Sequence, residues 1–277
     1  MNVALALAAA VVGGLDRLDA QLLLLHALGK ARQDRAWLLA HDGDPVAADA
    51  DQRYQQLCAR RAGGEPLAYI VGAKEFFGIE FQVDRRVLIP RPDTETLVEW
   101  ALEVLGESRE DRLSVIDLGT GSGAIALSIK KNCPSAQVDA VDVSFAALEV
   151  ATANAQALGI DVGLRLGSWL AGNPCRYHLI VSNPPYVATR DPHLTDLVHE
   201  PLTALESGSD GLDAIRTIID QAPVHLHRHC WLLLEHGWDQ ADAVRQLLHS
   251  AGFTGVRTRR DLAGRDRCTG GQWLELG

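Results

Sequence analysis

The chain has 277 residues, of which 47% are hydrophobic and 22% charged, as is typical of a globular protein. Its 36 acidic residues outnumber its 26 basic ones, which gives a net charge of −10. Because a negative surface repels a phosphate backbone, this balance disfavours a general grip on nucleic acid, although it leaves room for a local basic patch. The length allows one large or two smaller domains whose core needs no disulfide or metal.

The five cysteines are odd in number and include no CxxC pair, so we expect reduced thiols and neither a disulfide framework nor a metal site. Residues 1–15 are apolar but contain no basic residue, whereas a secretion signal starts with positive charge. The run is also shorter than the roughly 20 residues of a membrane helix. We therefore expect a cytoplasmic protein without a membrane segment. The cysteines are Cys58, Cys133, Cys175, Cys230 and Cys268.

Residues 1–75 are expected to form a small helical domain. Leucines spaced three and four residues apart predict a helix with one buried stripe that ends near Gly29. Further helices are expected around Trp37 and from Tyr54 to Gly63. Because basic and acidic residues nearly balance here, the domain does not resemble a basic arm that reads DNA. The leucines are Leu15, Leu18, Leu22, Leu25 and Leu28.

Residues 76–93 are expected to form a β-hairpin followed by a proline-rich linker. Hydrophobic residues alternate with polar or small ones over residues 77–83, as they do in strands, and Gly78 marks a turn or bulge. Two prolines then interrupt regular structure. A helix over residues 95–105 is expected to follow at the start of a second domain, residues 94–277.

Strands and helices are expected to alternate from residue 113 onward. This rhythm predicts a mostly parallel sheet that is covered by helices on both faces. The last two strands have a short connection, so they should form an antiparallel hairpin, with Gly270 and Gly271 as its turn. The predicted strands are residues 113–117, 137–143, 163–166, 179–182, 230–235, 255–259 and 272–276.

The first predicted strand of this sheet runs into the glycine-rich stretch Gly119-Thr120-Gly121-Ser122-Gly123, and a helix follows. Glycines let the backbone turn sharply and let a ligand approach the free N–H groups at the helix start. Together with Ala124 the stretch also matches the dinucleotide-binding fingerprint. A nucleotide-type binding turn is therefore expected, with a merely tight turn as the other interpretation.

Asp142 lies at the end of the next predicted strand, 25 residues after Asp117. A carboxylate at this position can accept hydrogen bonds from both hydroxyls of a ribose. That suits NAD and S-adenosylmethionine equally. A helix-capping role is the alternative.

The motif Asn183-Pro184-Pro185-Tyr186 follows the predicted strand 179–182. Its two prolines donate no backbone hydrogen bond and stiffen the loop, so carbonyl oxygens face outward beside the Asn183 side chain. Such a group of acceptors suits a planar –NH2 group, against whose flat face Tyr186 can pack. The motif therefore indicates a binding site for an amino or amide nitrogen.

In combination with the glycine-rich stretch, this motif resembles methyltransferases that use S-adenosylmethionine and act on amino groups. Two branches share it: adenine methyltransferases, and the PrmC/HemK family of release factor glutamine methyltransferases. The second branch is favoured by further segments that extend the resemblance over nearly the whole chain. These segments are residues 64–70 (GEPLAYI), 89–95 (IPRPDTE), 200–205 (EPLTAL) and 234–237 (LEHG).

The resemblance implies a class I S-adenosylmethionine-dependent methyltransferase, an α/β Rossmann-like fold with a mostly parallel seven-stranded sheet, plus the small helical domain for substrate recognition. It implies methylation of the glutamine in the Gly-Gly-Gln loop of peptide chain release factors. Residues 119–123 would hold the methionine part of the cofactor, Asp142 the ribose and Trp169 the adenine. Family members often have an acidic residue just before this tryptophan, and here Ser168 replaces it.

An amide nitrogen is a poor nucleophile, because its lone pair is delocalised. The site therefore needs acceptors that fix the –NH2 group and stabilise the positive charge that develops on nitrogen. The side-chain oxygen of Asn183 and the Pro184 carbonyl are the candidates, with Tyr186 beside them, and Pro185 completes the substrate site. His236 could be considered as a base, but without a paired nucleophile it is better explained by packing.

Three other functions stay open on the residues alone. The motif at 183–186 would also suit an adenine-N6 methyltransferase that acts on nucleic acid, which the net charge opposes. The glycine stretch and Asp142 would suit an NAD-linked oxidoreductase, but that leaves residues 183–186 unexplained. A binding module without activity would not need Asn183.

Overall fold

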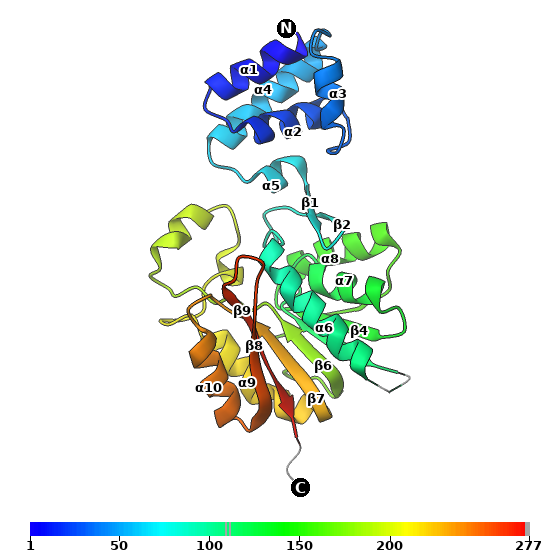
Figure 1. Cartoon of the computed structure of the whole chain (residues 1–277), viewed down its shortest axis with the longest axis vertical. Coiled ribbons are helices and arrows are strands. Elements are labelled where there is room, and N and C mark those ends of the chain that lie inside the picture. Colours follow the sequence, from blue (N-terminus) through cyan, green and yellow to red (C-terminus); the bar gives the residue numbers. More distant parts are fainter. Residues whose placement is uncertain (109, 111, 275–277) are drawn as a thin grey trace. The chain divides into compact units, whose positions relative to one another are not determined.

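The computed structural model describes residues 1–108, 110 and 112–274, which form two compact units, Met1–Ala73 and Lys74–Gly277. The first unit is helical and the second contains the large sheet (Figure 1). The units divide two residues before the boundary that the sequence suggested. No helix within these described ranges is long and apolar enough to cross a membrane.

The helices of the first unit pack around a core of their own, which includes Leu23, Leu24 and Leu25. Of the leucines predicted to form the buried stripe, Leu18 is 43% exposed, so its predicted burial is wrong. It lies in the first turn of its helix, whereas the second half of the helix is surrounded by its neighbours and is buried on more than one side. The helices are α1 Val3–Val12, α2 Arg17–Ala27, α3 Arg35–Ala40, α4 Ala48–Ala62 and α5 Leu67–Val71.

The predicted hairpin consists of β1 Ala73–Phe76 and β2 Ile79–Gln82. Phe77 and Gly78 form its turn, both with positive φ, which explains the glycine. After an extended stretch comes the short 3-10 helix η1 Pro92–Thr94, which leads directly into α6 Glu95–Glu107. This stretch carries residues into the site described below.

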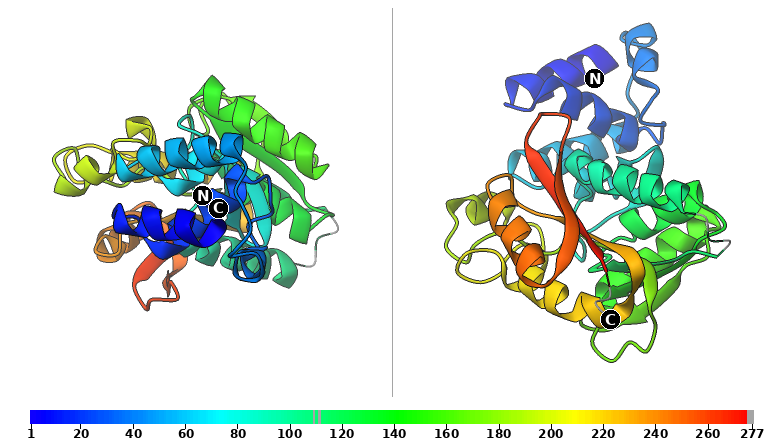
Figure 2. Two further views of the ribbon diagram at one scale, coloured as in Figure 1. Left: turned by 90° about the horizontal axis from the view of Figure 1, so that it is seen from above. Right: turned by 60° about the horizontal axis from the view of Figure 1, so that its bottom comes forward.

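The second unit is built on a seven-stranded sheet with the order β5-β4-β3-β6-β7-β9-β8. All neighbours are parallel except β9, which is antiparallel to both β7 and β8. The predicted α/β fold with an antiparallel C-terminal hairpin is thereby confirmed, and Figure 2 (right) shows the hairpin in orange and red. The strands are β3 Ser114–Leu118, β4 Gln137–Asp142, β5 Gly163–Leu166, β6 Tyr177–Ser182, β7 Leu226–Glu235, β8 Phe253–Arg260 and β9 Asp266–Trp273.

Helices cover both faces of this sheet, as the alternation along β7 shows. Leu232 and Leu234 belong to a core cluster with α9 Asp213–His225 and α10 Ala241–Ser250. Trp231, from the opposite face, packs against Trp100 of α6. The other elements of the unit are α7 Ala124–Asn132, α8 Phe145–Leu158, η2 Pro192–Leu197 and η3 Leu202–Ala204.

The position of the last strand differs from the prediction. Residues 275 and 276 of the predicted strand lie outside the described residues, and Gly270 and Gly271 do not form a turn but lie inside β9, opposite Leu233 and Leu232. A Cβ on Gly270 would come within 2.5 Å of the Leu233 side chain and 3.0 Å of Trp100. These glycines therefore make room for large neighbours on a crowded sheet.

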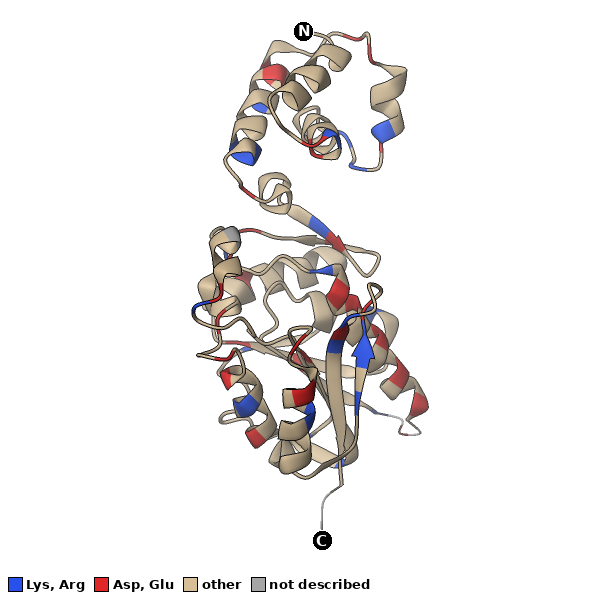
Figure 3. Cartoon of the chain, turned by 60° about the vertical axis from the view of Figure 1, so that its left-hand side comes forward, with Lys and Arg blue, Asp and Glu red and all other residues tan. Residues whose placement is uncertain are grey.

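Three arginines lie on β8, which is at the edge of the sheet (Figure 3 colours the charged residues that the structure describes). Arg260 pairs with Asp266 at 3.0 Å, and Arg259 pairs with Glu103. Arg257 lies over the Trp231 ring, 4.9 Å from its centroid. Charges and rings of the same unit thus engage these arginines.

Candidate functional site

Three of the motifs that the sequence singles out meet at one edge of the sheet. Leu118 at the end of β3 is in register with Val141 of β4 on one side and with Ser182 of β6 on the other. The segments that follow these strands, including Asp142 and Asn183, therefore emerge together. The carboxyl ends of parallel strands are where α/β folds bind ligands.

The glycine-rich turn after β3 is fixed to the neighbouring strand. The backbone N–H groups of Gly119 and Thr120 donate to the Val141 carbonyl at 2.8 and 3.0 Å. Gly119 has a φ of +72°, and a Cβ at this position would approach the Trp169 indole to 3.3 Å. Only glycine combines this backbone conformation with so close a neighbour.

A buried carboxyl supports the turn from below. Asp117 Oδ2 accepts a hydrogen bond from the Thr120 hydroxyl at 2.6 Å and one from the Ala126 N–H at 3.3 Å. Among the described residues, Oδ1 has no hydrogen-bond partner. Burial raises the pKa of Asp117 to about 7, and the Thr120 hydroxyl opposes this rise. From the sequence, Asp117 is recognisable only as the last residue of a predicted strand. Nothing in its spacing reveals that its side chain supports the glycine-rich turn.

Asp142 presents its carboxylate to the same turn. Its Oδ2 accepts from the Gly121 N–H at 2.9 Å, and its Oδ1 from the Ser144 N–H at 2.8 Å. Ser144, not Asp142, caps α8 through its hydroxyl, which accepts from the Ala147 N–H at 3.2 Å. Each carboxylate oxygen can still accept a second hydrogen bond from a ligand.

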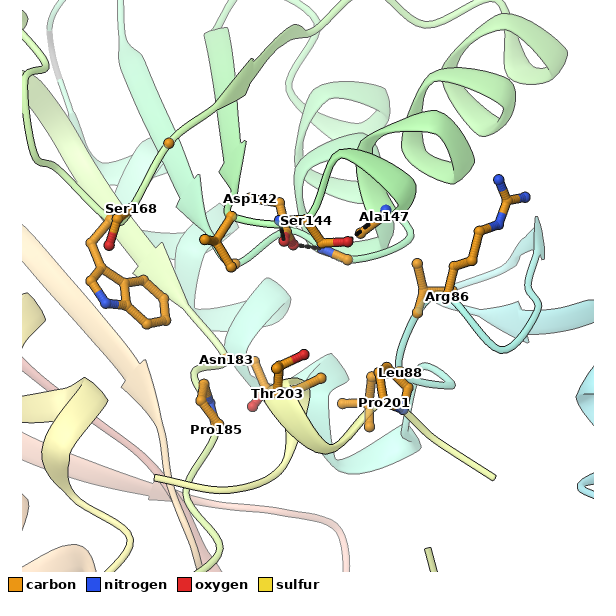
Figure 4. A pocket seen from close by; sticks show the side chains of 17 residues that line it. Arg86, Leu88, Asp142, Ser144, Ala147, Ser168, Asn183, Pro185, Pro201 and Thr203 are labelled. Atoms are coloured by element: carbon orange, nitrogen blue, oxygen red, sulfur yellow. Dashed lines mark hydrogen bonds between the residues drawn. The ribbon is translucent and has the colours of Figure 1, made fainter. Parts of the chain in front are cut away.

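A pocket opens beside this carboxylate. In Figure 4, Asp142 and Ser144 lie on one side of it, and Asn183 and Pro185 on the other. Trp169 also lines the pocket, with an unusual φ of +51°, and its ring lies against the glycine-rich turn. The structure thus brings five of the predicted cofactor residues around one space, namely Gly119, Gly121, Asp142, Trp169 and Asn183. The other three, Thr120, Ser122 and Gly123, do not line this pocket, and the side chains of Thr120 and Ser122 are buried in the turn.

Several lining residues escaped the sequence interpretation. Val143 is 71% exposed although it is apolar, which offers a hydrophobic surface next to Asp142. Thr203 comes from a segment that the sequence marked only as family-like, and Leu88 comes from the predicted linker, one residue before another such segment. Their side chains are ordinary in composition, so only the folded chain reveals their position.

In the motif 183–186, the hydrogen-bond acceptors that the prolines predicted remain available to a ligand. Asn183 Nδ2 donates to the Thr94 hydroxyl at 3.2 Å, which turns Oδ1 to the other side of the amide. Within the described ranges, neither Asn183 Oδ1 nor the Pro184 carbonyl accepts a hydrogen bond. Burial raises the pKa of Tyr186 well above its ordinary value, so its hydroxyl remains protonated.

A second pocket adjoins the first. Asn183, Leu88 and Ala204 line both, whereas Pro184 and Tyr186 line only the second. Asn183 therefore lies between the two spaces. This arrangement can hold one ligand on each side of a single amide group.

A long loop, residues 187–205, contributes to the lining of both pockets and is held at two points. The Val187 N–H donates to the Leu205 carbonyl at 2.8 Å, which joins the ends of the loop. The nearly buried carboxylate of Glu200 accepts from the Ile89 N–H at 3.1 Å and pairs with Arg91. Two of the family-like segments, 89–95 and 200–205, thus meet at the site.

His236 is fully buried, and both of its ring nitrogens have partners. Nε2 lies 2.7 Å from the Thr269 hydroxyl and Nδ1 lies 2.8 Å from the Gly237 carbonyl. Burial lowers its pKa. These contacts agree with a packing role. Within residues 1–108, 110 and 112–274, no group of three His, Cys, Asp or Glu side chains is arranged to hold a metal ion.

Comparisons with known proteins cover both units. Residues 4–72 match the PrmC N-terminal domain, and residues 98–210 match the methyltransferase small domain. A release factor glutamine methyltransferase from Xylella fastidiosa (strain Temecula1) is 52% identical over 97% of both chains. The protein of the same name from Bordetella pertussis is 51% identical over 93% of this chain and 95% of its own.

Among solved structures, a methyltransferase from Pyrococcus furiosus matches with a TM-score of 0.55 at 16% identity, over 78% of this chain and 97% of the other. At this identity the likeness concerns the fold, which is that of class I methyltransferases.

Proposed function

The chain belongs to the release factor glutamine methyltransferase family, and from this premise we propose that it methylates the glutamine in the Gly-Gly-Gln loop of class 1 peptide chain release factors. The methyl group comes from S-adenosylmethionine and goes to the side-chain amide nitrogen. One observation carries the assignment: the free oxygen of Asn183 and the free Pro184 carbonyl border a pocket next to the pocket of Asp142. The reaction takes place in the cytoplasm, where translation ends.

The first pocket suits S-adenosylmethionine. Residues 119–123 hold the methionine part, and Asp142 binds the ribose hydroxyls with the lone pairs that its backbone contacts leave free. Trp169 and the exposed Val143 offer apolar surface for the adenine. Because Ser168 stands where relatives often have an acid, the adenine amino group is held by a neutral contact at most. When bound, the sulfonium supplies an electrophilic methyl group.

The second pocket suits the glutamine side chain. Its –NH2 group has two donors, and Asn183 Oδ1 and the Pro184 carbonyl supply two acceptors. Tyr186 packs against the flat face of the amide. Pro185 lines the first pocket and not the second, and it contributes by keeping the loop rigid. The two acceptors hold the nitrogen toward the first pocket and stabilise the positive charge that develops on it. No strong base is required of these residues.

Residues 1–73 recognise the release factor as a protein. This unit has its own core and lies outside the unit that contains the two pockets. Its basic and acidic residues nearly balance, which suits contact with a protein better than contact with a phosphate backbone.

The alternative substrate is adenine in nucleic acid, because its amino group would fit the same acceptors. The net charge of −10 and the engaged arginines of β8 argue against it. Incubation with labelled S-adenosylmethionine separates the two. We expect label on wild-type release factor, and none on its Gln→Ala loop variant or on DNA. Label on DNA alone would select the alternative.

A further inference from the structure

Glu235 is a buried carboxyl group at the site edge that the mechanism above does not use. It is the last residue of β7, and its neighbour Leu234 is in register with Ser182 of β6. Asn183 and Glu235 therefore follow paired residues of adjacent strands. Glu235 is only 1% exposed, although an ionisable side chain is rarely buried so fully without a reason.

Two hydroxyl groups from the site approach this carboxyl. The Thr94 and Tyr186 side chains lie beside Glu235, and both oppose the rise of its pKa. Within the described part of the chain, Oε2 has no hydrogen-bond partner of its own. Arg267 lies near enough to act by its charge, but it already pairs with Asp93 at 3.0 Å and with Asp261 at 3.2 Å. The Glu235 carboxyl, with an oxygen that has no hydrogen-bond partner in that part of the chain, is thus available as an acceptor for the two hydroxyls.

The Thr94 hydroxyl accepts from Asn183 Nδ2 at 3.2 Å. Its single proton is therefore available for donation, and the Glu235 carboxyl lies beside it. As long as Glu235 is an acceptor, the amide nitrogen of Asn183 faces Thr94 and its oxygen faces the substrate side.

We propose that Glu235 is a positioning residue, which acts through Thr94 on Asn183 and directly on Tyr186 to keep both in the geometry that binds the glutamine amide. The proposal rests on the proposed function and deepens it. It assigns no contact between Glu235 and substrate. The role is best served by the carboxylate form, since a charged carboxylate is the stronger acceptor and has no proton of its own to donate.

The charges around Glu235 determine how it responds to pH. Burial raises its pKa to about 7, the Thr94 hydroxyl and Arg267 oppose the rise, and Asp93 adds to it. The Cys268 thiol of β9 faces it as well, and burial keeps that thiol protonated. Because protonated Glu235 is a weaker acceptor and carries a proton that competes as a donor, turnover should fall as the pH drops through about 7.

Steady-state kinetics of the full chain on intact release factor test this proposal. In Glu235→Gln we expect kcat to fall by about 10²-fold, as is typical when a reacting group is misplaced, with little change in the KM for S-adenosylmethionine. The fall of kcat below about pH 7 should disappear in this variant. Glu99→Gln, an exposed carboxyl on α6, is the matched control.

Thr94 offers a second route if Glu235→Gln does not fold. Thr94→Val keeps the shape but removes the hydroxyl and should lower kcat, whereas Thr94→Ser keeps the hydroxyl and should restore it. Equal kcat in the Val and Ser variants, or a Glu235→Gln enzyme with wild-type kcat and pH profile, would overturn the proposal. A wild-type enzyme that is inactive on release factor would instead refute the proposed function.

Discussion

Asn183 and Thr94 lie 89 residues apart in the chain, yet the amide nitrogen of one donates to the hydroxyl of the other at 3.2 Å. The contact joins the loop after β6 to the start of α6 and decides which end of the Asn183 amide is free. Because the nitrogen is engaged, the oxygen is the group that can receive an –NH2 donor. The first prediction follows from this orientation.

Asn183→Ala should fold and bind S-adenosylmethionine but lose most of its turnover. Removing one polar group that stabilises a transition state typically costs about 10²- to 10³-fold in kcat. Turnover on release factor and calorimetric affinity for the cofactor are the two measurements, with Asn132→Ala on the exposed end of α7 as a control. If Asn183→Ala kept the turnover of the wild type, the role given to Asn183 in the mechanism would be wrong.

Asp142→Ala should weaken the binding of S-adenosylmethionine. The ribose hydroxyls would lose a charged acceptor, worth roughly 1.5–3 kcal/mol, and the Gly121 and Ser144 N–H groups would lose their partner as well. Titration calorimetry measures the change. If affinity stays the same, the carboxylate serves only the backbone of the turn.

Asp117 should make stability depend on pH. Its pKa is raised to about 7 in the folded chain, so the folded state favours the protonated form, and this contribution to stability is lost as the pH rises through about 7. Asp117→Asn cannot titrate. Relative to this variant, the wild type should therefore lose free energy of unfolding between about pH 5 and about pH 8.

Urea unfolding at the two pH values gives the comparison for Asp117. Asp161→Asn, at an exposed position, is the control and should follow the wild type at both values. If the free energies of unfolding of the wild type and of Asp117→Asn differed by the same amount at both pH values, the raised pKa assigned to Asp117 would be contradicted.

The fold could be predicted largely because β3 and β6 contain short apolar runs and β4 alternates apolar with polar residues, each with turn residues after it. Such local patterns determine where elements lie but not what packs against them. The glycines at 270 and 271 show the limit: a turn and a crowded strand both favour glycine, and the difference depends on Trp100, which is distant in sequence. The predicted burial of Leu18 is wrong for the same reason, since the burial of each residue along α2 depends on the helices that pack against it.

The residues of the site also fall into two groups, those that the sequence reveals and those that only the folded chain reveals. Residues 119–123, Asp142 and 183–186 are recognisable because each follows a strand and has an unusual composition. Thr94 and Glu235 are not recognisable, because a threonine and a glutamate are common and their meaning lies in the contact with Asn183 and Tyr186. Asp117 and Val143 acquire their roles only from burial or exposure in the folded chain.

A chain that begins at Ala73 should keep the hairpin and the large sheet and should bind S-adenosylmethionine like the full chain. Its kcat/KM on intact release factor should fall steeply, because the function proposed above assigns recognition of the protein substrate to the helical unit and the chemistry to the second unit. Calorimetry and steady-state kinetics are the measurements. If this shortened chain had the kcat/KM of the full chain, the helical unit would not be needed to recognise release factor.

The chain contains a Gly-Gly-Gln sequence of its own at Gln272, which should not be a substrate. Gln272 lies within β9, opposite Trp231, and its side chain donates to the His229 carbonyl at 2.6 Å. To reach a pocket it would have to leave the sheet and with it Trp273, whose burial is worth about 1.5–3 kcal/mol. The Gln272→Ala variant should therefore methylate release factor with the turnover of the wild type.

Mass spectrometry of the enzyme incubated with S-adenosylmethionine alone completes this test. The C-terminal peptide should keep its mass. A gain of about 14 Da on this peptide would show that the strand opens and that the chain methylates itself.

Tandem mass spectrometry of release factor after incubation with the enzyme and S-adenosylmethionine tests the central claim most directly. We predict a single gain of about 14 Da, located on the glutamine of the Gly-Gly-Gln loop and absent when Asn183→Ala replaces the wild-type enzyme. A release factor that stays unmodified with active enzyme, or a methyl group on any other residue, would contradict the account.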